Sequence, residues 1–276
     1  MKRLLQFLAL SIVYTSVFAQ EKSSVQYLAN EGVMITHGES SILFDPLYDN
    51  SYGQYQMVPQ PMLDAIFSGA SPYDSVDAVF VSHFHGDHFS AGEMLRLLRQ
   101  RQGIALYAPA QAVAEMRKLA TADDEEIFER VTQFDLDYGD VPVFVRKEGI
   151  LIEAVHIPHS GWPTARTDVQ NIAFRVTLQD TSTILHLGDS DARLVHFEQD
   201  ESYWDERHVD LAFPPYWFFL SDDGREILED IVAARHSIGI HVPDSFRSDP
   251  ASVPQELFGD ELFTQPGEGR RFTGTQ

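Results

Sequence analysis

A short segment rich in metal-binding side chains restricts this chain more than any other feature of its sequence. It reads His83, Phe84, His85, Gly86, Asp87 and His88. A continuous apolar run at residues 78–81 precedes it and predicts a strand buried on both faces. Alternation along an extended chain sends His83 and His85 to the same side, and Gly86 permits a turn that brings Asp87 and His88 to a neighbouring point. The segment can therefore contribute ligands to two adjacent metal ions.

The hydrophobic pattern around this segment predicts a layered α/β domain. Strands are expected at residues 25–28, 33–35, 41–44, 78–81, 104–108, 150–155, 209–213 and 237–240, with a hairpin formed by 171–178 and 183–187. Helices are expected at residues 110–120 and 222–234, and a capping box from Ser90 to Glu93 predicts another that ends at Gly103. Strands followed by helices, after an opening made only of strands, predict sheets with helices on their outer faces.

Two segments are expected to lack this regular alternation. Residues 50–72 contain Pro59, Pro61, Gly69 and Pro72 and predict a loop-rich insertion. The first residues predict a signal peptide, because Lys2 and Arg3 precede a short apolar run and residues 17–19 offer a cleavage site. Cleavage after Ala19 would leave a single domain of residues 20–276, exported to the periplasm or secreted, with no stable membrane anchor.

Charge and cysteine content exclude several classes of partner and site. The chain has 42 acidic and 20 basic residues, a formal net charge of -22. Such a surface repels phosphate backbones, so nucleic acid is not expected as a partner. There is no cysteine, which excludes disulfides, a lipid-anchored cysteine and thiolate metal sites. A small-molecule substrate remains as the expected partner, and the sequence leaves the oligomeric state open.

The His-x-His-x-Asp-His pattern of residues 83–88 resembles the signature of the metallo-β-lactamase superfamily. Four other landmarks follow the order of motifs in that family. They are Asp45 after an apolar strand, a histidine in the segment His156-Ile157-Pro158-His159, Asp189 after a glycine, and His241 before Val242-Pro243. Residues 262–272 resemble the closing strand pair of the family's second sheet. The similarity extends from about residue 25 to residue 243, nearly the whole mature chain.

This resemblance implies a four-layer αβ/βα sandwich with a two-metal site at one edge. It implies that His83, His85 and His159 hold the first metal, that Asp87, His88 and His241 hold the second, and that Asp189 bridges both. It further implies that Asp45 does not bind metal itself but orients the residues that do. Asp87 and Asp189 are the residues expected to matter most directly for catalysis.

The chemistry of such a ligand set is metal-assisted hydrolysis. Two dications a few ångströms apart can share a hydroxide at neutral pH and stabilise the oxyanion that it creates. An ester, lactone, amide or phosphoester is the expected substrate bond. Imidazoles with carboxylates suit zinc first, and manganese or iron also fits.

The segment His156-Ile157-Pro158-His159 corresponds to the third motif of the family, and either of its two histidines could be the metal ligand. Residues 150–155 predict a strand that His156 continues, whereas Pro158 has no N–H to donate and breaks the ladder. His159 then falls on the loop beyond the strand end, as His83 and His85 do. His159 is therefore the expected ligand, and His156 is expected to pack behind it.

Four residues are candidates for the wall of a substrate pocket. Trp162 and Arg166 lie on the loop after His159, and Tyr216 and Trp217 follow a predicted strand. Two alternative functions remain: a true zinc β-lactamase, and a non-catalytic metal-binding protein of the same fold. Zinc β-lactamases generally lack an aspartate at the position that corresponds to Asp189, the fourth motif of the family, so Asp189 argues against a β-lactamase. A complete ligand set argues against the second.

Overall fold

The computed structural model describes residues 22–198 and 201–274, so the predicted signal peptide lies outside the described residues. A seven-stranded mixed sheet has the order β12-β1-β2-β3-β4-β5-β6, and a five-stranded mixed sheet has the order β11-β10-β9-β8-β7. The first sheet contains β1 (Lys22–Ala29), β2 (Gly32–His37), β3 (Ser40–Phe44), β4 (Val76–Phe80), β5 (Ala105–Pro109), β6 (Val131–Phe134) and β12 (Gly269–Thr273). The second contains β7 (Val143–Lys147), β8 (Ile150–His156), β9 (Ile172–Leu178), β10 (Ser182–His186) and β11 (Leu211–Phe213).

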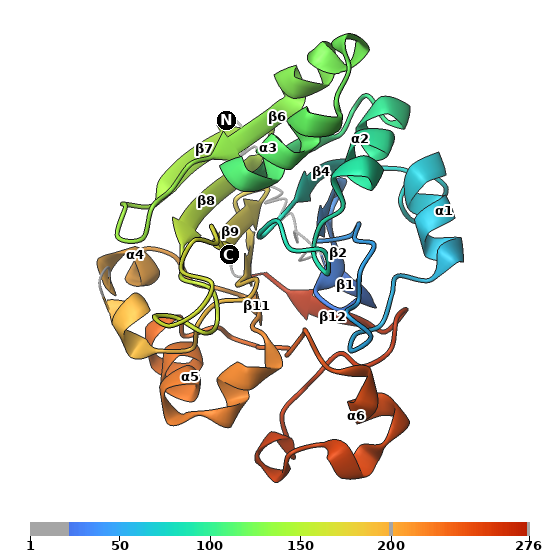
Figure 1. The fold of residues 1–276 in the computed structure, drawn as a ribbon. Helices are drawn as coiled ribbons and strands as arrows, with labels where there is room; N and C mark the ends of the chain where they lie inside the picture. The colour runs from blue at the N-terminus through green and yellow to red at the C-terminus, as the bar shows by residue number, and fades with distance from the viewer. Residues whose placement is uncertain (1–21, 199–200, 275–276) are drawn as a thin grey trace, which may run out of the picture.

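Helices cover the outer face of each sheet (Figure 1). On the first sheet lie α1 (Gln60–Ser68), α2 (Ala91–Gln100), α3 (Ala110–Leu119) and the 3₁₀ segment η1 (Ala122–Arg130). On the side of the second lie α4 (Glu201–Asp205), α5 (Asp222–Glu226), the π-helical turn η5 (Ile227–Ile231), and the short turns η2 (Leu194–His196) and η4 (Tyr216–Leu220). Beyond them, α6 (Asp244–Ser248), η6 (Pro250–Ser252) and η7 (Gln255–Leu257) precede β12. The expected four-layer αβ/βα architecture is confirmed.

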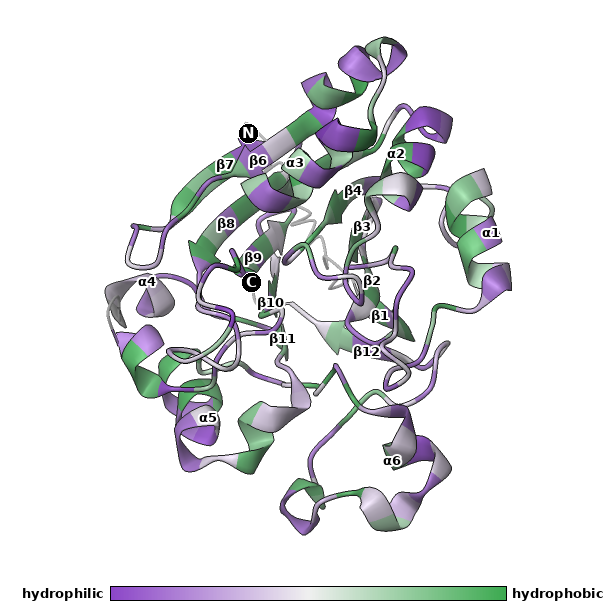
Figure 2. Cartoon of the chain, in the orientation of Figure 1, coloured by the Kyte–Doolittle hydropathy of each residue, from purple (hydrophilic) through white to green (hydrophobic). Residues whose placement is uncertain are grey.

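Three apolar clusters hold these layers together. The central one joins the facing sides of the two sheets and includes Ile35, Phe80, Phe174 and Phe213, all fully buried. The other two lie between a sheet and its helices. Figure 2 shows the strands mainly in the hydrophobic colours, whereas the peripheral helices carry hydrophilic stretches. Among the described residues, no helix is long and apolar enough to cross a membrane.

Several local expectations need correction. Residues 50–72, expected to be a loop, contain the helix α1. Pro59 and Pro61 do not prevent it, because they stand at its N-terminus, where a backbone N–H has no partner within the helix. Ser90 makes no capping bond and instead donates its hydroxyl to Asp49 Oδ2 at 2.8 Å; the capping box joins Thr121 and Asp124.

The chain after residue 222 also differs from the prediction. The expected helix over residues 222–234 is α5 followed by η5, which ends at Ile231. Residues 237–240 form only isolated bridges, such as the one from Ser237 to Ala212. The expected closing pair of the second sheet is absent from the described residues, since β12 pairs antiparallel with β1 of the first sheet. β6 and β7 were not predicted, because short strands with half-exposed faces give weak patterns.

A buried ion pair provides a test of the second sheet. Arg175 on β9 donates Nε and Nη2 to the Glu153 carboxylate on β8 at 2.8 and 3.0 Å, and neither residue is exposed. We expect Arg175→Met to destabilise the fold by roughly 3 kcal/mol, because among the described residues it leaves the buried Glu153 with Arg207 as its remaining ion-pair partner. Arg146→Met is the control, since its pair with Asp180 is exposed and is worth about 0–1 kcal/mol. Urea unfolding measures both, and equal effects would contradict the expectation.

Candidate metal centre

The loop after β4 is held by the aspartate that follows the neighbouring strand β3. Asp45 accepts the Ser82 N–H on Oδ1 at 2.8 Å, and its Oδ2 lies 3.0 Å from His88 Nδ1. A proton on His88 Nδ1 therefore points to Asp45, which leaves the Nε2 lone pair free on the opposite side of the ring. Asp45 thus lies behind the loop that carries His83 and His88.

A first group of ligand atoms gathers at the ends of β4, β8 and β10. His83 Nε2 lies 3.0 Å from His85 Nδ1, which lies 3.2 Å from His159 Nε2. Asp189 Oδ2 lies 3.1 Å from His159 Nε2 and 3.8 Å from His83 Nε2. Tetrahedral zinc with bonds of roughly 2.0–2.1 Å requires ligand atoms about 3.3 Å apart. The four atoms have nearly this spacing.

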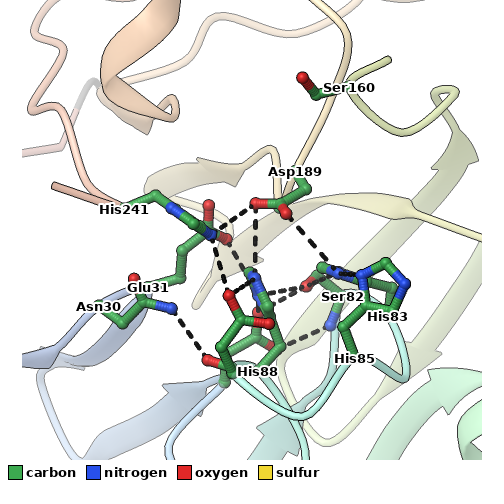
Figure 3. Close-up of polar contacts among 12 residues, drawn as sticks. Asn30, Glu31, Ser82, His83, His85, His88, Ser160, Asp189 and His241 are labelled. Carbon is green, nitrogen blue, oxygen red and sulfur yellow. Dashed lines mark hydrogen bonds and ion pairs between the residues drawn. The ribbon is translucent and has the colours of Figure 1, made fainter. Parts of the chain in front are cut away.

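A second group lies on the other side of Asp189. Asp189 Oδ1 is 3.1 Å from His241 Nε2 and 3.4 Å from His88 Nε2. Asp87 Oδ2 is 3.4 Å from His241 Nε2 and 3.7 Å from His88 Nε2. The two oxygens of Asp189 thus face different groups. Figure 3 shows the histidines and Glu31 gathered around this carboxylate.

The loop that carries Asp189 permits little variation in sequence. Gly188 has φ +55°, and a Cβ there would lie 2.5 Å from Asn171 Oδ1 and 2.6 Å from Ser82 Cβ. The Asp189 N–H donates to Asn171 Oδ1 at 2.9 Å, and its carbonyl accepts the Ser160 N–H at 2.7 Å. These contacts tie the Asp189 loop to the His159 loop, so the two deliver their side chains together.

The donor atoms fit divalent metal ions. Three ligand atoms are buried and have no hydrogen-bond partner in the part of the chain that the structure describes: His88 Nε2, His241 Nε2 and Asp189 Oδ1. Four carboxylates meet here, Glu31, Asp45, Asp87 and Asp189, and within residues 22–198 and 201–274 their ion pairs are with histidines only. Buried carboxylates without a compensating cation are strongly unfavourable, so metal ions bound among these side chains would stabilise the cluster.

The pKa values of the buried carboxyl groups of Glu31 and Asp189 are shifted in opposite directions. Burial raises the pKa of Glu31 well above its usual range; His88 opposes this shift, and the nearby aspartates add to it. Burial would also raise the pKa of Asp189, but the imidazoles of His241 and His88 hold it well below its ordinary value. Asp189 is therefore ionised, which is the state in which a carboxylate binds metal.

The pKa values of the imidazoles are also shifted in opposite directions. Burial, followed by the neighbouring His159, lowers the pKa of His85 to about 4, and burial lowers the pKa of His83 as well. Both are therefore neutral at pH 7, the state that binds metal. Burial opposes charge on His88 too, but Asp189 and Glu31 outweigh it and raise the pKa of His88. The carboxylates around His88 thus favour positive charge at this position.

A third grouping, of Glu31, Asp45 and His186, is unsuited to metal. His186 Nδ1 accepts the Gly188 N–H at 3.2 Å, so its proton resides on Nε2, which lies 3.0 Å from the Glu31 carbonyl oxygen. Both nitrogens are occupied, and the ring stacks on Phe44 at 4.8 Å. His186 is a core histidine that supports the loops on either side of it.

His159 and His156 lie in different places. His159 is buried in the first group, and its Nδ1 lies 2.8 Å from the Ser160 carbonyl oxygen, which directs Nε2 at the site. His156 ends β8 and lines a separate cavity with Tyr138 and His196. Burial lowers the pKa of His156. His156 thus lies away from both groups of ligand atoms.

A cavity of about 460 Å³ opens onto both groups. Its wall includes two of the four expected pocket residues, Arg166 and Trp217. The other two face elsewhere: Trp162 packs edge-on against His196 at 4.8 Å, and Tyr216 packs on Phe246 at 5.4 Å. Their positions next to ligand loops in the sequence did not determine the direction of their side chains.

Sequence reasoning missed several residues of the site. Tyr52, Gln54 and Tyr55 come from the segment expected to be a loop insertion, and all three line the cavity. The Tyr55 ring stands edge-on to His241 at 4.1 Å. Glu31 is fully buried beside His88. The one available signal for Glu31 was an acidic residue between two apolar strands, and such residues are usually solvated turn positions.

Comparison with known proteins agrees with this geometry. The family described as "Beta-lactamase superfamily domain" matches residues 40–218, more than half of the chain. The chain therefore belongs to the metallo-β-lactamase superfamily. It is 27% identical over 167 residues to a UPF0173 metal-dependent hydrolase of Pyrococcus abyssi, covering 60% of this chain and 61% of the relative.

Solved structures show the same fold at low sequence identity. One is Igni18, a metallo hydrolase from Ignicoccus hospitalis, with a TM-score of 0.59 and 14% identity over 91% of this chain and 98% of that one. Another is an isothiocyanate hydrolase from Delia radicum gut bacteria, with a TM-score of 0.59 and 12% identity over 91% of this chain and 99% of that one. These similarities establish the fold alone.

Paired alanine variants test which third-motif histidine binds metal. We expect His159→Ala to lower the metal content by about one ion per chain, because it removes one of three imidazoles from the first group. His156→Ala should retain the full content. Elemental analysis after reloading and dialysis measures both variants. A reversed result would contradict the assignment of His159.

Proposed function

We propose that the protein is a binuclear metal-dependent hydrolase that cleaves an ester, lactone or phosphoester bond in a small molecule. The observation that carries this proposal is the position of Asp189, whose Oδ2 lies 3.1 Å from His159 Nε2 and whose Oδ1 lies 3.1 Å from His241 Nε2. A carboxylate with one oxygen toward each group is suited to bridge two cations and to offset their mutual repulsion.

The ligand roles in this proposal follow the two groups. His83, His85 and His159 would hold one metal, and Asp87, His88 and His241 the other, with zinc the first candidate and manganese or iron also suitable. Two bound dications would supply an activated water at neutral pH and stabilise a developing oxyanion.

The chain's own residues would orient the substrate. Arg166 has φ +55° and donates its guanidinium to the Ser160 carbonyl at 3.2 Å, which holds a positive charge at the cavity wall. Trp217 donates Nε1 to the Ser190 carbonyl at 3.0 Å and packs on His241 at 5.2 Å. Its indole, with Tyr52 and Tyr55, offers apolar surface for the rest of the substrate. Asp87 lines the same cavity and can accept a hydrogen bond from a bound molecule.

The open cavity favours catalysis over metal storage, because a storage site needs no wall of aromatic and cationic side chains. Export of the mature chain, after cleavage behind Ala19, is part of the proposal and rests on the N-terminal sequence.

A substrate screen tests the proposed reaction. The protein loaded with zinc or manganese is assayed against lactones, phosphodiesters, thioesters and β-lactams. We expect metal-dependent turnover in the ester, lactone or phosphoester classes and negligible turnover of β-lactams, because the Asp189 carboxylate crowds the second group. Efficient carbapenem cleavage would favour the zinc β-lactamase alternative, and a metal-loaded but inert protein would favour the non-catalytic one.

Replacing the bridging carboxylate tests the role of Asp189. We expect Asp189→Asn to reduce turnover roughly 100-fold or more, since even residues outside the ligand shell change metal affinity or activity by about 10–100-fold. The thermal stability of the metal-free protein should change far less, because the amide keeps the shape of the side chain. Asp191→Asn, on the same loop but paired with Arg193 and His196, is the control and should retain both metals. Full activity of Asp189→Asn would exclude a bridging role.

A further inference from the structure

Glu31 is a buried carboxylate whose contacts do not account for its presence. It lies in the turn between β1 and β2 and has no exposed surface, and neither of its carboxylate oxygens has a hydrogen-bond partner among the described residues. Its Oε2 lies 3.6 Å from His88 Nδ1. Asp45 Oδ2 is closer to that nitrogen, at 3.0 Å, and a ring nitrogen carries only one proton. Glu31 therefore has no donor left on His88.

The turn that carries Glu31 is attached to both neighbouring ligand loops. Asn30 Nδ2 donates to the Asp87 carbonyl at 2.9 Å, and the His241 N–H donates to the Asn30 carbonyl at 3.0 Å. His186 Nε2 lies 3.0 Å from the Glu31 carbonyl oxygen. Gly32 fits tightly, since a Cβ there would lie 3.2 Å from the Asp45 carbonyl oxygen. The backbone around Glu31 is thus fixed, and its side chain extends into the site (Figure 3).

The carboxylate lies beside three of the four residues of the second group. One ligand atom from each of Glu31, His88, Asp189 and His241 lies within 4.8 Å of all the others. All four residues are buried, and each has at least one buried atom without a hydrogen-bond partner. A cation among them would satisfy these atoms together, whereas no single hydrogen bond could.

We propose that Glu31 supplies a further oxygen to the second metal and makes that site selective for a hard divalent ion such as manganese or ferrous iron. This inference rests on the proposed two-metal function. The first group offers three imidazoles and one carboxylate oxygen. The second offers two imidazoles and, with Glu31, three carboxylates. Oxygen-rich sites favour hard ions relative to zinc, whereas imidazole-rich sites suit zinc. The two sites therefore differ in the metal that they prefer.

Competitive metal loading of matched variants tests the proposal. Wild type, Glu31→Gln, Glu31→Asp and the control Glu39→Gln, in an exposed turn, are titrated with Mn²⁺ and with Zn²⁺. Bound metal is measured by elemental analysis, and free Mn²⁺ by its electron paramagnetic resonance signal. We expect Glu31→Gln to weaken Mn²⁺ binding at one of two sites by roughly 10–100-fold, with a smaller change for Zn²⁺. Glu31→Asp should retain more Mn²⁺ affinity than Glu31→Gln, and Glu39→Gln should match wild type.

Thermal unfolding separates a ligand from a residue that merely shapes the turn. In the metal-free protein, Glu31→Gln should leave the Tm unchanged or raise it, because a buried carboxyl group whose oxygens have no hydrogen-bond partner is removed. With Mn²⁺ the same variant should gain less stability than wild type. A Tm lowered equally with and without metal would overturn the proposal, as would unchanged Mn²⁺ affinity. If wild type itself binds no metal, the proposed function fails first; if wild type binds two ions and Glu31→Gln behaves identically, only this inference fails.

Discussion

The structure depends on the meeting of four buried carboxylates at one end of two sheets, with imidazoles as their only ion-pair partners among the described residues. Each comes from a different connection: Glu31 from the β1–β2 turn, Asp45 after β3, Asp87 after β4 and Asp189 after β10. Because the donors span both sheets, the central apolar core has to fix the two sheets relative to each other before the site can form. The site and the core are therefore coupled parts of one structure.

Local patterns were sufficient where the chemistry follows directly after a strand. The apolar run before His83 predicted β4. Pro158, which cannot continue the ladder, placed His159 beyond the end of β8. These two inferences use residues close in sequence, which is why they did not need the tertiary structure, whereas Asp45, Asp189 and His241 were located by the resemblance to the order of motifs in the metallo-β-lactamase superfamily.

Residues whose role depends on long-range packing could not be predicted in this way. Glu31 has the sequence context of a solvated turn, and only the approach of the His88 and His241 loops buries it. Tyr55 reaches the site because residues 50–58 fold back over it, with the Asp244 N–H donating to the Gln54 carbonyl at 2.8 Å. Trp162 shows the opposite case. It was expected in the pocket wall because it lies three residues from His159, but its side chain packs on His196 instead. The direction of a loop side chain is set by the partners it packs against, and the pattern of residues does not encode these.

Backbone strain links the site to distant parts of the chain. Asp45 and His241 have φ values of +38° and +58°, a region that residues with a Cβ rarely adopt. Such conformations persist only where surrounding contacts impose them. For His241 the contact is the hydrogen bond to the Asn30 carbonyl, and for Asp45 it is the close approach of Gly32. Both contacts belong to the β1–β2 turn, and β12 covers the outer edge of β1. The last described strand of the chain thus stabilises the hairpin that holds two residues of the centre in their strained conformations, although it contributes no side chain to either group.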